Sequence, residues 1–158
     1  MGNWIEAGER APAFSLTADD GSKVSLADLK GQPVVVYFYP RDDTSGCTRE
    51  ACAFRDQQAK LKKLGAQLLG ISADNTESHG KFRDKYQLNF PLLSDPDHAV
   101  AEKYGAWREK NMYGKKSLGI QRSTFLVDAD GKIAKVWKAV KVDGHDGQVV
   151  AALEKLAE

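Results

Sequence analysis

The first segments of the chain alternate apolar and polar side chains with the period of a β-strand. Residues 14–17 and 23–26 both show this alternation, and an Asp-Asp-Gly cluster at 19–21 separates them. Such a cluster favours a tight turn between two strands. The pattern therefore predicts an N-terminal β-hairpin within residues 11–31.

The next segment changes from alternation to a continuous apolar run. Residues 34–39 are β-branched or aromatic and lie between Pro33 and Pro40, which is typical of a strand buried on both faces of a sheet. A helical apolar period follows over residues 45–64, and residues 67–71 indicate another strand. Together these segments predict a β-α-β unit.

Capping residues mark the ends of two further helices. Thr76 or Ser78 is placed to cap a helix that ends at Tyr86. A second helix is predicted over residues 96–104, because proline favours the first helical position and Gly105 stands where a C-terminal cap belongs.

The last third of the chain predicts a second hairpin and a final helix. Residues 123–127 and 133–136 are apolar runs that flank an Asp-Ala-Asp-Gly turn. Apolar positions within residues 149–156 then have the spacing of an amphipathic helix. The segment 108–120 is rich in glycine and lysine, and we interpret it as an ordered but mobile loop.

Length and composition set the size of the fold. The chain has 158 residues, of which 42% are hydrophobic, and this is enough to fill one core. We therefore expect a single domain over residues 1–158. Its predicted class is α/β, with a central mixed β-sheet, flanking helices and the N-terminal hairpin.

The charge pattern argues against several kinds of partner. The chain has 23 basic and 22 acidic residues and a net charge of +1, without a basic block that could follow a phosphate backbone, so nucleic acid is not expected. The first residues carry an acid where a secretion signal needs basic residues, and no apolar run approaches the ~20 residues that span a bilayer. We expect a cytoplasmic protein with no membrane contact.

The two cysteines are the candidates for chemistry. Two are too few for a disulfide scaffold in a chain of this size, so they are reactive, metal-binding or merely buried. Cys47 falls in the first turn of the helix predicted over residues 45–64. A helix N-terminus presents unpaired N–H groups and partial positive charge, which favour a thiolate there.

Helical geometry separates the environments of the two cysteines. At ~100° per residue, Cys47 shares an apolar face with Ala51 and Phe54, whereas Cys52 lies on the polar face. A core role does not explain Cys52, so a redox partnership with Cys47 is the natural alternative. An intact helix places their Cα atoms ~8.7 Å apart, and a disulfide needs less than about 7 Å. We therefore hypothesise that the helix unwinds on oxidation.

Two other classes of protein use similar residues. A thioredoxin-like disulfide oxidoreductase would pair a strand-helix site with Cys-x2-Cys, but the spacing here is Cys-x4-Cys. A zinc-binding module would need two of His79, His98 and His145 beside the cysteines. Those histidines are scattered without ligand pairing, and we interpret each as a surface or capping residue.

The residues before and around Cys47 resemble a known family. The segment Pro40-x3-Thr44-x2-Cys47 resembles the active-site signature of the peroxiredoxins. Residues 38–40 (Phe-Tyr-Pro) and 46–52 (Gly-Cys-Thr-x-Glu-Ala-Cys) are similar to its bacterioferritin-comigratory, or Q-type, branch. The similarity extends over nearly the whole chain and includes residues 11–14, 69–72, 93–95 and 125–131.

The resemblance implies a fold, an activity and partners. The fold would be thioredoxin-like, and the activity the reduction of hydrogen peroxide and organic hydroperoxides. Thioredoxin or a glutaredoxin-like dithiol donor would regenerate the enzyme. No cofactor or metal is expected, and a monomer is the expected assembly.

The resemblance also implies roles for individual residues. Cys47 would be the peroxidatic cysteine, and Cys52 the resolving cysteine that forms a disulfide with it. Thr44 would supply a hydroxyl that contacts the peroxide, and Arg122 a guanidinium beside the thiolate.

Three more residues are expected to support this site. Pro40 and Gly46 belong to the signature, and Glu50 is placed to orient Arg122 through a charged hydrogen bond. The Q-type branch usually has proline where this chain has Ser45. This difference affects the rigidity of the loop, although serine can also cap a helix.

Overall fold

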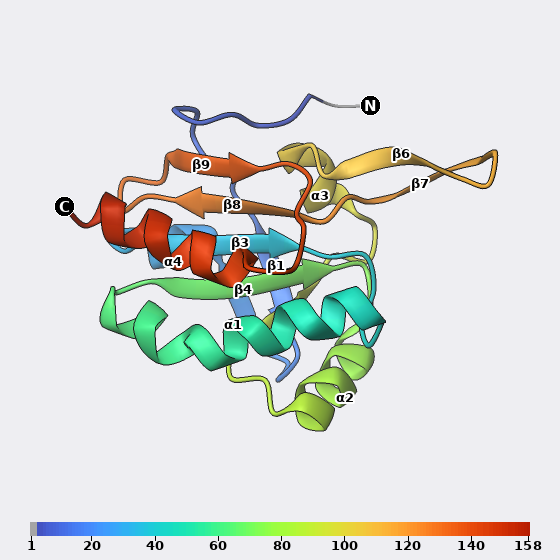
Figure 1. Cartoon of the computed structure of the whole chain (residues 1–158), viewed down its shortest axis with the longest axis horizontal. Helices are drawn as coiled ribbons and strands as arrows, with labels where there is room; N and C mark the ends of the chain where they lie inside the picture. Colours follow the sequence, from blue (N-terminus) through green and yellow to red (C-terminus); the bar gives the residue numbers. More distant parts are fainter. Residues whose placement is uncertain (1–2) are drawn as a thin grey trace.

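A central β-sheet with helices on both faces forms the body of the molecule (Figure 1). The computed structural model describes residues 3–158, except for the side chain of Met112. The sheet has the strand order β2-β1-β5-β4-β3-β8-β9. Its strands are β1 (Ser15–Ala18), β2 (Lys23–Ser25), β3 (Val34–Phe38), β4 (Gln67–Ser72), β5 (Leu92–Ser94), β8 (Ser123–Val127) and β9 (Ile133–Trp137).

The helices and a separate hairpin complete the fold. A short 3-10 helix, η1 (Leu26–Leu29), follows β2, and the hairpin comprises β6 (Trp107–Met112) and β7 (Lys115–Ile120). The α-helices are α1 (Ser45–Lys63), α2 (Thr76–Tyr86), α3 (Ala99–Tyr104) and α4 (His145–Leu156). Among the described residues, no helix has the length and apolar character needed to cross a membrane.

Strand β3 lies inside the sheet, between β4 and β8, and all five of its residues are buried. It pairs in parallel with β4 and antiparallel with β8. Because successive side chains point to opposite faces, Val34 and Val36 enter one core, whereas Val35 and Tyr37 enter the other. The predicted central strand, β-α-β unit and mixed α/β arrangement are confirmed.

The two faces of the sheet have different coverings. Helices α1 and α4 pack against each other on the face of Tyr37 (Figure 1). Helix α3 and the N-terminal residues cover the opposite face. The N-terminal hairpin β1-β2 is confirmed, and it joins the main sheet through antiparallel pairing of β1 with β5.

Parallel pairing of β3 with β4 positions the functional site. Adjacent parallel strands need a crossover connection, here α1, that returns the chain to the starting edge of the sheet. The first turn of α1 therefore lies at the carboxyl end of β3. In α/β folds this edge is where ligands commonly bind.

The segment 108–120 was predicted to be a loop, and this interpretation is wrong. It forms most of the antiparallel hairpin β6-β7, which projects from the body of the fold (Figure 1). Tyr113 and Gly114 have φ values of 55° and 79°, as in the tight two-residue turn that fits the twist of a hairpin. The two strands of this hairpin bury little of their surface, so the sequence lacks the apolar alternation that would have indicated them.

Two helix starts also differ from the prediction. The cap of α2 is Asn75, whose side chain accepts a hydrogen bond from the Ser78 amide at 2.8 Å. Helix α3 begins at Ala99 rather than at residue 96, because the buried Asp95 carboxylate accepts bonds from the Val100 and Ala101 amides. The short strand β5 was not predicted, since three residues, of which two are apolar, are too few for a periodic signal.

Gly105 ends α3 as expected, and its surroundings give a test of the packing of the N-terminal segment. Its φ is +87°, and an added Cβ would lie 2.5 Å from the Trp4 Cα. Gly65 has a similar φ of +75° but no atom within 4 Å of such a Cβ. Gly65→Ala should therefore cost only the left-handed backbone term of roughly 1–2 kcal/mol, whereas Gly105→Ala should cost roughly 2 kcal/mol more through overpacking.

Urea unfolding of the two variants and the parent protein measures this difference. Equal losses of unfolding free energy in the two variants would contradict the close packing of residues 3–4 on Gly105.

Candidate active site

Cys47 is the third residue of α1 and lies just beyond the carboxyl end of β3. Its thiol is free, and the residue is only 1% exposed. The helix is capped by Thr44 in extended conformation, without a side-chain capping bond, so Ser45 is not the cap. Because the first amides of a helix have no partner within the helix, the Cys47 sulfur lies close to unpaired N–H donors and to the partial positive charge of the helix N-terminus.

Arg122 contacts this sulfur directly. It stands immediately before β8, and the antiparallel register pairs Phe38 at the end of β3 with Ser123. The register thus brings residue 122 to the same edge of the sheet as the first turn of α1. The Arg122 Nη2 donates to the Cys47 Sγ at 3.2 Å.

The other arm of the guanidinium binds Glu50. Arg122 Nη1 donates to Glu50 Oε1 at 2.7 Å, and the two side chains are 15% and 2% exposed. Glu50 lies one turn after Cys47 on the same helix. The planar fork of arginine is therefore fixed by two contacts to one helix face, which a lysine could not reproduce.

Gly46 permits the close approach of this guanidinium to the helix. A Cβ at residue 46 would lie 3.1 Å from Arg122 Nη2, which is tighter than ordinary van der Waals contact. A larger residue would push the guanidinium away from the sulfur. The need for glycine at this position is steric, because its φ is not among the positive values of the chain.

Burial dominates the protonation of Glu50. Removal from water raises the pKa of Glu50 to about 7, although Arg122 acts in the opposite direction through its charge and its hydrogen bond. The second carboxyl oxygen, Oε2, is buried without a hydrogen-bond partner among the described residues. Burial also works against the charge of Arg122, but Glu50 and Cys47 outweigh it and raise the pKa of the guanidinium.

Thr44 and Lys110 lie around the same site. Thr44 is exposed, its hydroxyl donates to the Arg41 carbonyl at 3.0 Å, and its own carbonyl accepts the Thr48 amide at 2.8 Å. Lys110, on β6, was not singled out from the sequence. Burial and the charge of Arg122 lower the pKa of Lys110, while Cys47 has the opposite effect.

Cys52 lies five residues after Cys47 on the same uninterrupted helix. It is partly buried, and its thiol is also free. The buried residues of α1 include Cys47, Ala51 and Phe54 but not Cys52, as the helical spacing predicted. The two sulfurs therefore leave one helix in different directions.

The histidines do not assemble a zinc site with the cysteines. Within residues 3–158, the only group of potential metal ligands joins Asp42, Asp74 and His79, and it contains neither cysteine. The expectation that every histidine is a surface or capping residue is wrong for two of them. His79 is fully buried against Asp42, and His145 is 1% exposed and bonded to Thr124.

Asp42 and its contact with His79 have no distinctive signal in the sequence. The two residues lie 37 positions apart, and neither belongs to a periodic or capping pattern that involves the other. An Asp-Asp pair between a buried strand and a helix was the only local signal, and such pairs are common in solvated loops.

Comparison with known proteins identifies relatives of this fold and site. The family model described as the AhpC/TSA family matches residues 7–136. A protein named putative peroxiredoxin bcp from Coxiella burnetii is 54% identical over 149 residues, which cover 94% of this chain and 99% of that protein. Peroxiredoxin Bcp from Bacillus subtilis is 45% identical, with 98% of each chain covered.

Solved structures agree with this relationship. The bacterioferritin comigratory protein of Xanthomonas campestris, studied for alkyl peroxide reduction, superimposes with a TM-score of 0.91 at 40% identity, covering 97% of this chain and all of that one. A cysteine-to-serine mutant of PrxQ from Xylella fastidiosa gives a TM-score of 0.94 at 33% identity, with 99% of this chain and 100% of that one covered. The thioredoxin-like fold that was expected is confirmed.

The protonation of Glu50 gives a stability test. A carboxyl group whose folded pKa is raised from 4.5 to about 7 keeps its proton in the folded state when the unfolded chain has lost it. This contribution is therefore complete below the unfolded pKa and disappears as pH rises through about 7. Relative to Glu50→Gln, the reduced protein should lose roughly 3 kcal/mol of unfolding free energy across this window.

Urea unfolding of both proteins at a series of pH values measures the difference. Glu154→Gln, which changes an exposed glutamate on α4, is the control and should follow the parent protein. Parallel stability curves for Glu50→Gln and the parent protein would show that Glu50 titrates as an ordinary surface carboxyl.

Proposed function

The chain belongs to the AhpC/TSA family as a peroxiredoxin related to Bcp, a thiol peroxidase, and from this we propose which of its residues carry the reaction. Cys47 is the peroxidatic cysteine and Cys52 the resolving cysteine. The observation that supports the first assignment is the 3.2 Å contact between the Cys47 sulfur and the Arg122 guanidinium. Residues 1–158 form one catalytic domain in this proposal.

The first step is attack by the Cys47 thiolate on a hydroperoxide. The sulfur forms a bond to one peroxide oxygen, the O–O bond breaks, and the other oxygen leaves with the bonding electrons and takes up a proton. The products are a sulfenic acid on Cys47 and water or an alcohol. Hydrogen peroxide and organic hydroperoxides are the proposed substrates, in keeping with the alkyl peroxide reduction studied in the Xanthomonas campestris relative.

Thiolate formation alone supplies only part of the acceleration, because nucleophilicity falls as the basicity of a thiol falls. The rest comes from stabilising negative charge on the departing oxygen. Arg122 is suited to this role, since its guanidinium is permanently charged and already lies beside the sulfur. The hydroxyl of Thr44 and the amides of Gly46 and Cys47 are the other proposed donors.

Three residues support these groups without reacting. Glu50 holds one arm of Arg122, so that the other arm faces Cys47. Gly46 leaves space for the guanidinium. Pro40 follows β3 and, because it cannot extend the ladder as a donor, helps to turn the chain into the loop that carries Thr44.

The second step joins the two cysteines. The Cys52 thiol attacks the sulfenic sulfur of Cys47, a disulfide forms and water leaves. Both residues occupy one helix, whose ideal geometry holds the Cα atoms ~8.7 Å apart. Part of α1 therefore unwinds before the disulfide can close.

A dithiol donor then reduces the disulfide and becomes oxidised itself, which returns both thiols. We propose thioredoxin or a glutaredoxin-like protein for this role, as the resemblance to the Q-type peroxiredoxins implies. A reducing compartment, the cytoplasm, suits such a cycle. A monomer is the proposed assembly, as the resemblance to the Q-type branch implies.

Intact mass spectrometry tests the assignment of the two cysteines. Fully reduced protein is mixed with one equivalent of hydrogen peroxide. The parent should lose ~2 Da as a disulfide forms, and Cys52→Ser should gain ~16 Da or yield a trappable sulfenic acid. Cys47→Ser should show no rapid change, and peroxide consumption at the parent rate in this variant would contradict the peroxidatic assignment.

Amide hydrogen exchange tests the unwinding of α1. In the reduced protein, the amides of residues 46–56 from Thr48 onward should be protected by the intact helix, in which the Thr48 amide donates to the Thr44 carbonyl. In the disulfide form, the same amides should exchange faster, because the first turns have opened. Residues of α4 serve as an internal reference, and equal protection of residues 46–56 in the two forms would exclude the proposed unwinding.

A further inference from the structure

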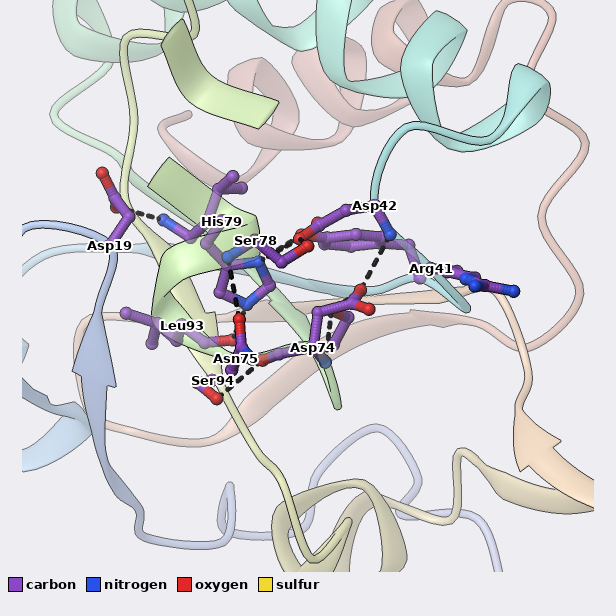
Figure 2. A network of polar contacts seen from close by, with 12 residues as sticks. Asp19, Arg41, Asp42, Asp74, Asn75, Ser78, His79, Leu93 and Ser94 are labelled. Carbon is purple, nitrogen blue, oxygen red and sulfur yellow. Dashed lines mark hydrogen bonds and ion pairs between the residues drawn. The ribbon is translucent and has the colours of Figure 1, made fainter. Parts of the chain in front are cut away.

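Helix α2 holds the loop between β3 and α1 through Asp42 (Figure 2). The Asp42 amide donates to Asp74 Oδ2 at 2.8 Å, and Asp42 Oδ1 accepts from the Tyr39 hydroxyl at 2.6 Å. Asp42 Oδ2 accepts from the Ser78 hydroxyl at 2.8 Å and faces His79 Nδ1 at 2.7 Å. Four contacts thus fix one residue of the loop, five positions before Cys47.

The contact between Asp42 and His79 is shielded from water. The two side chains are 4% and 0% exposed. His79 Nε2 lies 3.0 Å from the Leu93 carbonyl, which can only accept, so Nε2 carries a proton. Nδ1 then faces a carboxylate, and one further proton lies between them, on the ring or on the carboxyl. Breaking such a buried contact leaves a polar group without a partner.

The next residue of the loop is also held by α2. Asp43 Oδ2 accepts from Lys85 Nζ at 2.8 Å, and Asp43 Oδ1 accepts from the Tyr86 hydroxyl at 2.7 Å. Asp43 has a φ of 57°, in the left-handed region that is unfavourable for a residue with a Cβ. The start of α2 therefore holds Asp42, and its end holds this unfavourable turn at Asp43.

The part of the loop that α2 holds ends at Asp43, and the two residues after it have few contacts. Thr44 and Ser45 are exposed, and among the described residues the only side-chain hydrogen bond of Thr44 stays within the loop. The proposed reaction requires α1 to unwind from its first turn. Since Asp42 is attached to α2 and to residues that directly follow β4 and β3, the segment that unwinds has a fixed end at Asp42.

We propose that Asp42 and His79 are positioning residues for the peroxidase reaction. Their contact, the Asp42–His79 pair, holds the loop so that Thr44 and Cys47 face the peroxide in the folded form. The same restraint opposes the unwinding that brings Cys47 to Cys52. The Asp42–His79 pair therefore favours attack and slows disulfide closure, and this inference rests on the proposed roles of the two cysteines.

The contacts within this cluster do not favour a bound cation. Asp42, Asp74 and His79 lie close enough to share an ion, but both Asp42 oxygens, both His79 nitrogens and Asp74 Oδ2 already have partners. Asp74 Oδ2 accepts both the Asp42 amide and the Ser72 hydroxyl, the latter at 2.7 Å. A cation would have to replace these bonds, so the observed contacts are those of a hydrogen-bonded anchor.

A matched pair of substitutions separates the two contacts of His79. Asparagine can place an amide donor near the position of Nδ1, so His79→Asn keeps the bond to Asp42 and loses the bond to Leu93. Glutamine reaches the position of Nε2, so His79→Gln keeps the bond to Leu93 and loses the bond to Asp42. The proposal predicts that only loss of the Asp42 contact changes the two chemical steps.

Rapid mixing with hydrogen peroxide, acid quenching and mass analysis measure both steps. Sulfenic acid formation is followed in a Cys52→Ser background, and disulfide closure is followed with both cysteines present. His79→Gln should slow attack about tenfold through misplacement of the reacting groups, and it should accelerate closure. His79→Asn should stay within about threefold of the parent in both steps, and Ser78→Ala should change both in the same directions as His79→Gln, but less.

Tyr104→Phe is the control for a general loss of stability. It removes a buried hydrogen bond to the Pro12 carbonyl on the opposite face of the sheet, and it should leave both rates unchanged. If His79→Gln and Ser78→Ala slow both steps alike or alter neither, the proposed positioning role is wrong. If the Cys52→Ser parent forms no sulfenic acid, the assignment of Cys47 fails instead.

Discussion

The guanidinium of Arg122 connects the two parts of the molecule on which the chemistry depends. It stands before β8 at the edge of the sheet and reaches Cys47 and Glu50, both on the first turns of α1. While the sulfur is a thiolate, the contact is an attraction between opposite charges. A sulfenic acid is neutral, so oxidation weakens the hold of Arg122 on this turn. The chemical step therefore removes part of the restraint against the unwinding that the next step requires.

The elements that could be predicted from the sequence are those with strong local patterns. Strand β3 and helix α1 have long apolar signals, and the place of Cys47 follows from where they meet. Arg122 had no local signal, since only the pairing of β3 with β8 brings it to the sulfur, and it was found through the family resemblance alone. The hairpin β6-β7 was missed because few of its described side chains are buried, and the burial of His79 because its partner lies 37 residues away.

The protonation of Glu50 changes the charge at this site but not the orientation of the Arg122 guanidinium. Its Oε1 can accept the Arg122 hydrogen bond whether or not the carboxyl carries a proton on the other oxygen. The position of the guanidinium is therefore maintained on both sides of the pKa of about 7. What changes is the charge beside it, because an ionised Glu50 offsets the positive charge that acts on Cys47. A protonated Glu50 leaves more of that charge for the thiolate.

The buried polar contacts on the two sides of Thr44 respond differently to the oxidation of Cys47. Those of Asp42 join Asp74, which follows β4, and residues of α2, and these partners keep their charges when Cys47 is oxidised, so nothing in the reaction weakens them. The contact of Cys47 with Arg122 depends on the charge of the reacting sulfur. The segment that unwinds therefore stays attached at Asp42, whereas the contact between Cys47 and Arg122 has been weakened by the oxidation of the sulfur. An enzyme with both cysteines on one helix needs this asymmetry, because a loop released at both ends would lose the geometry for the next attack.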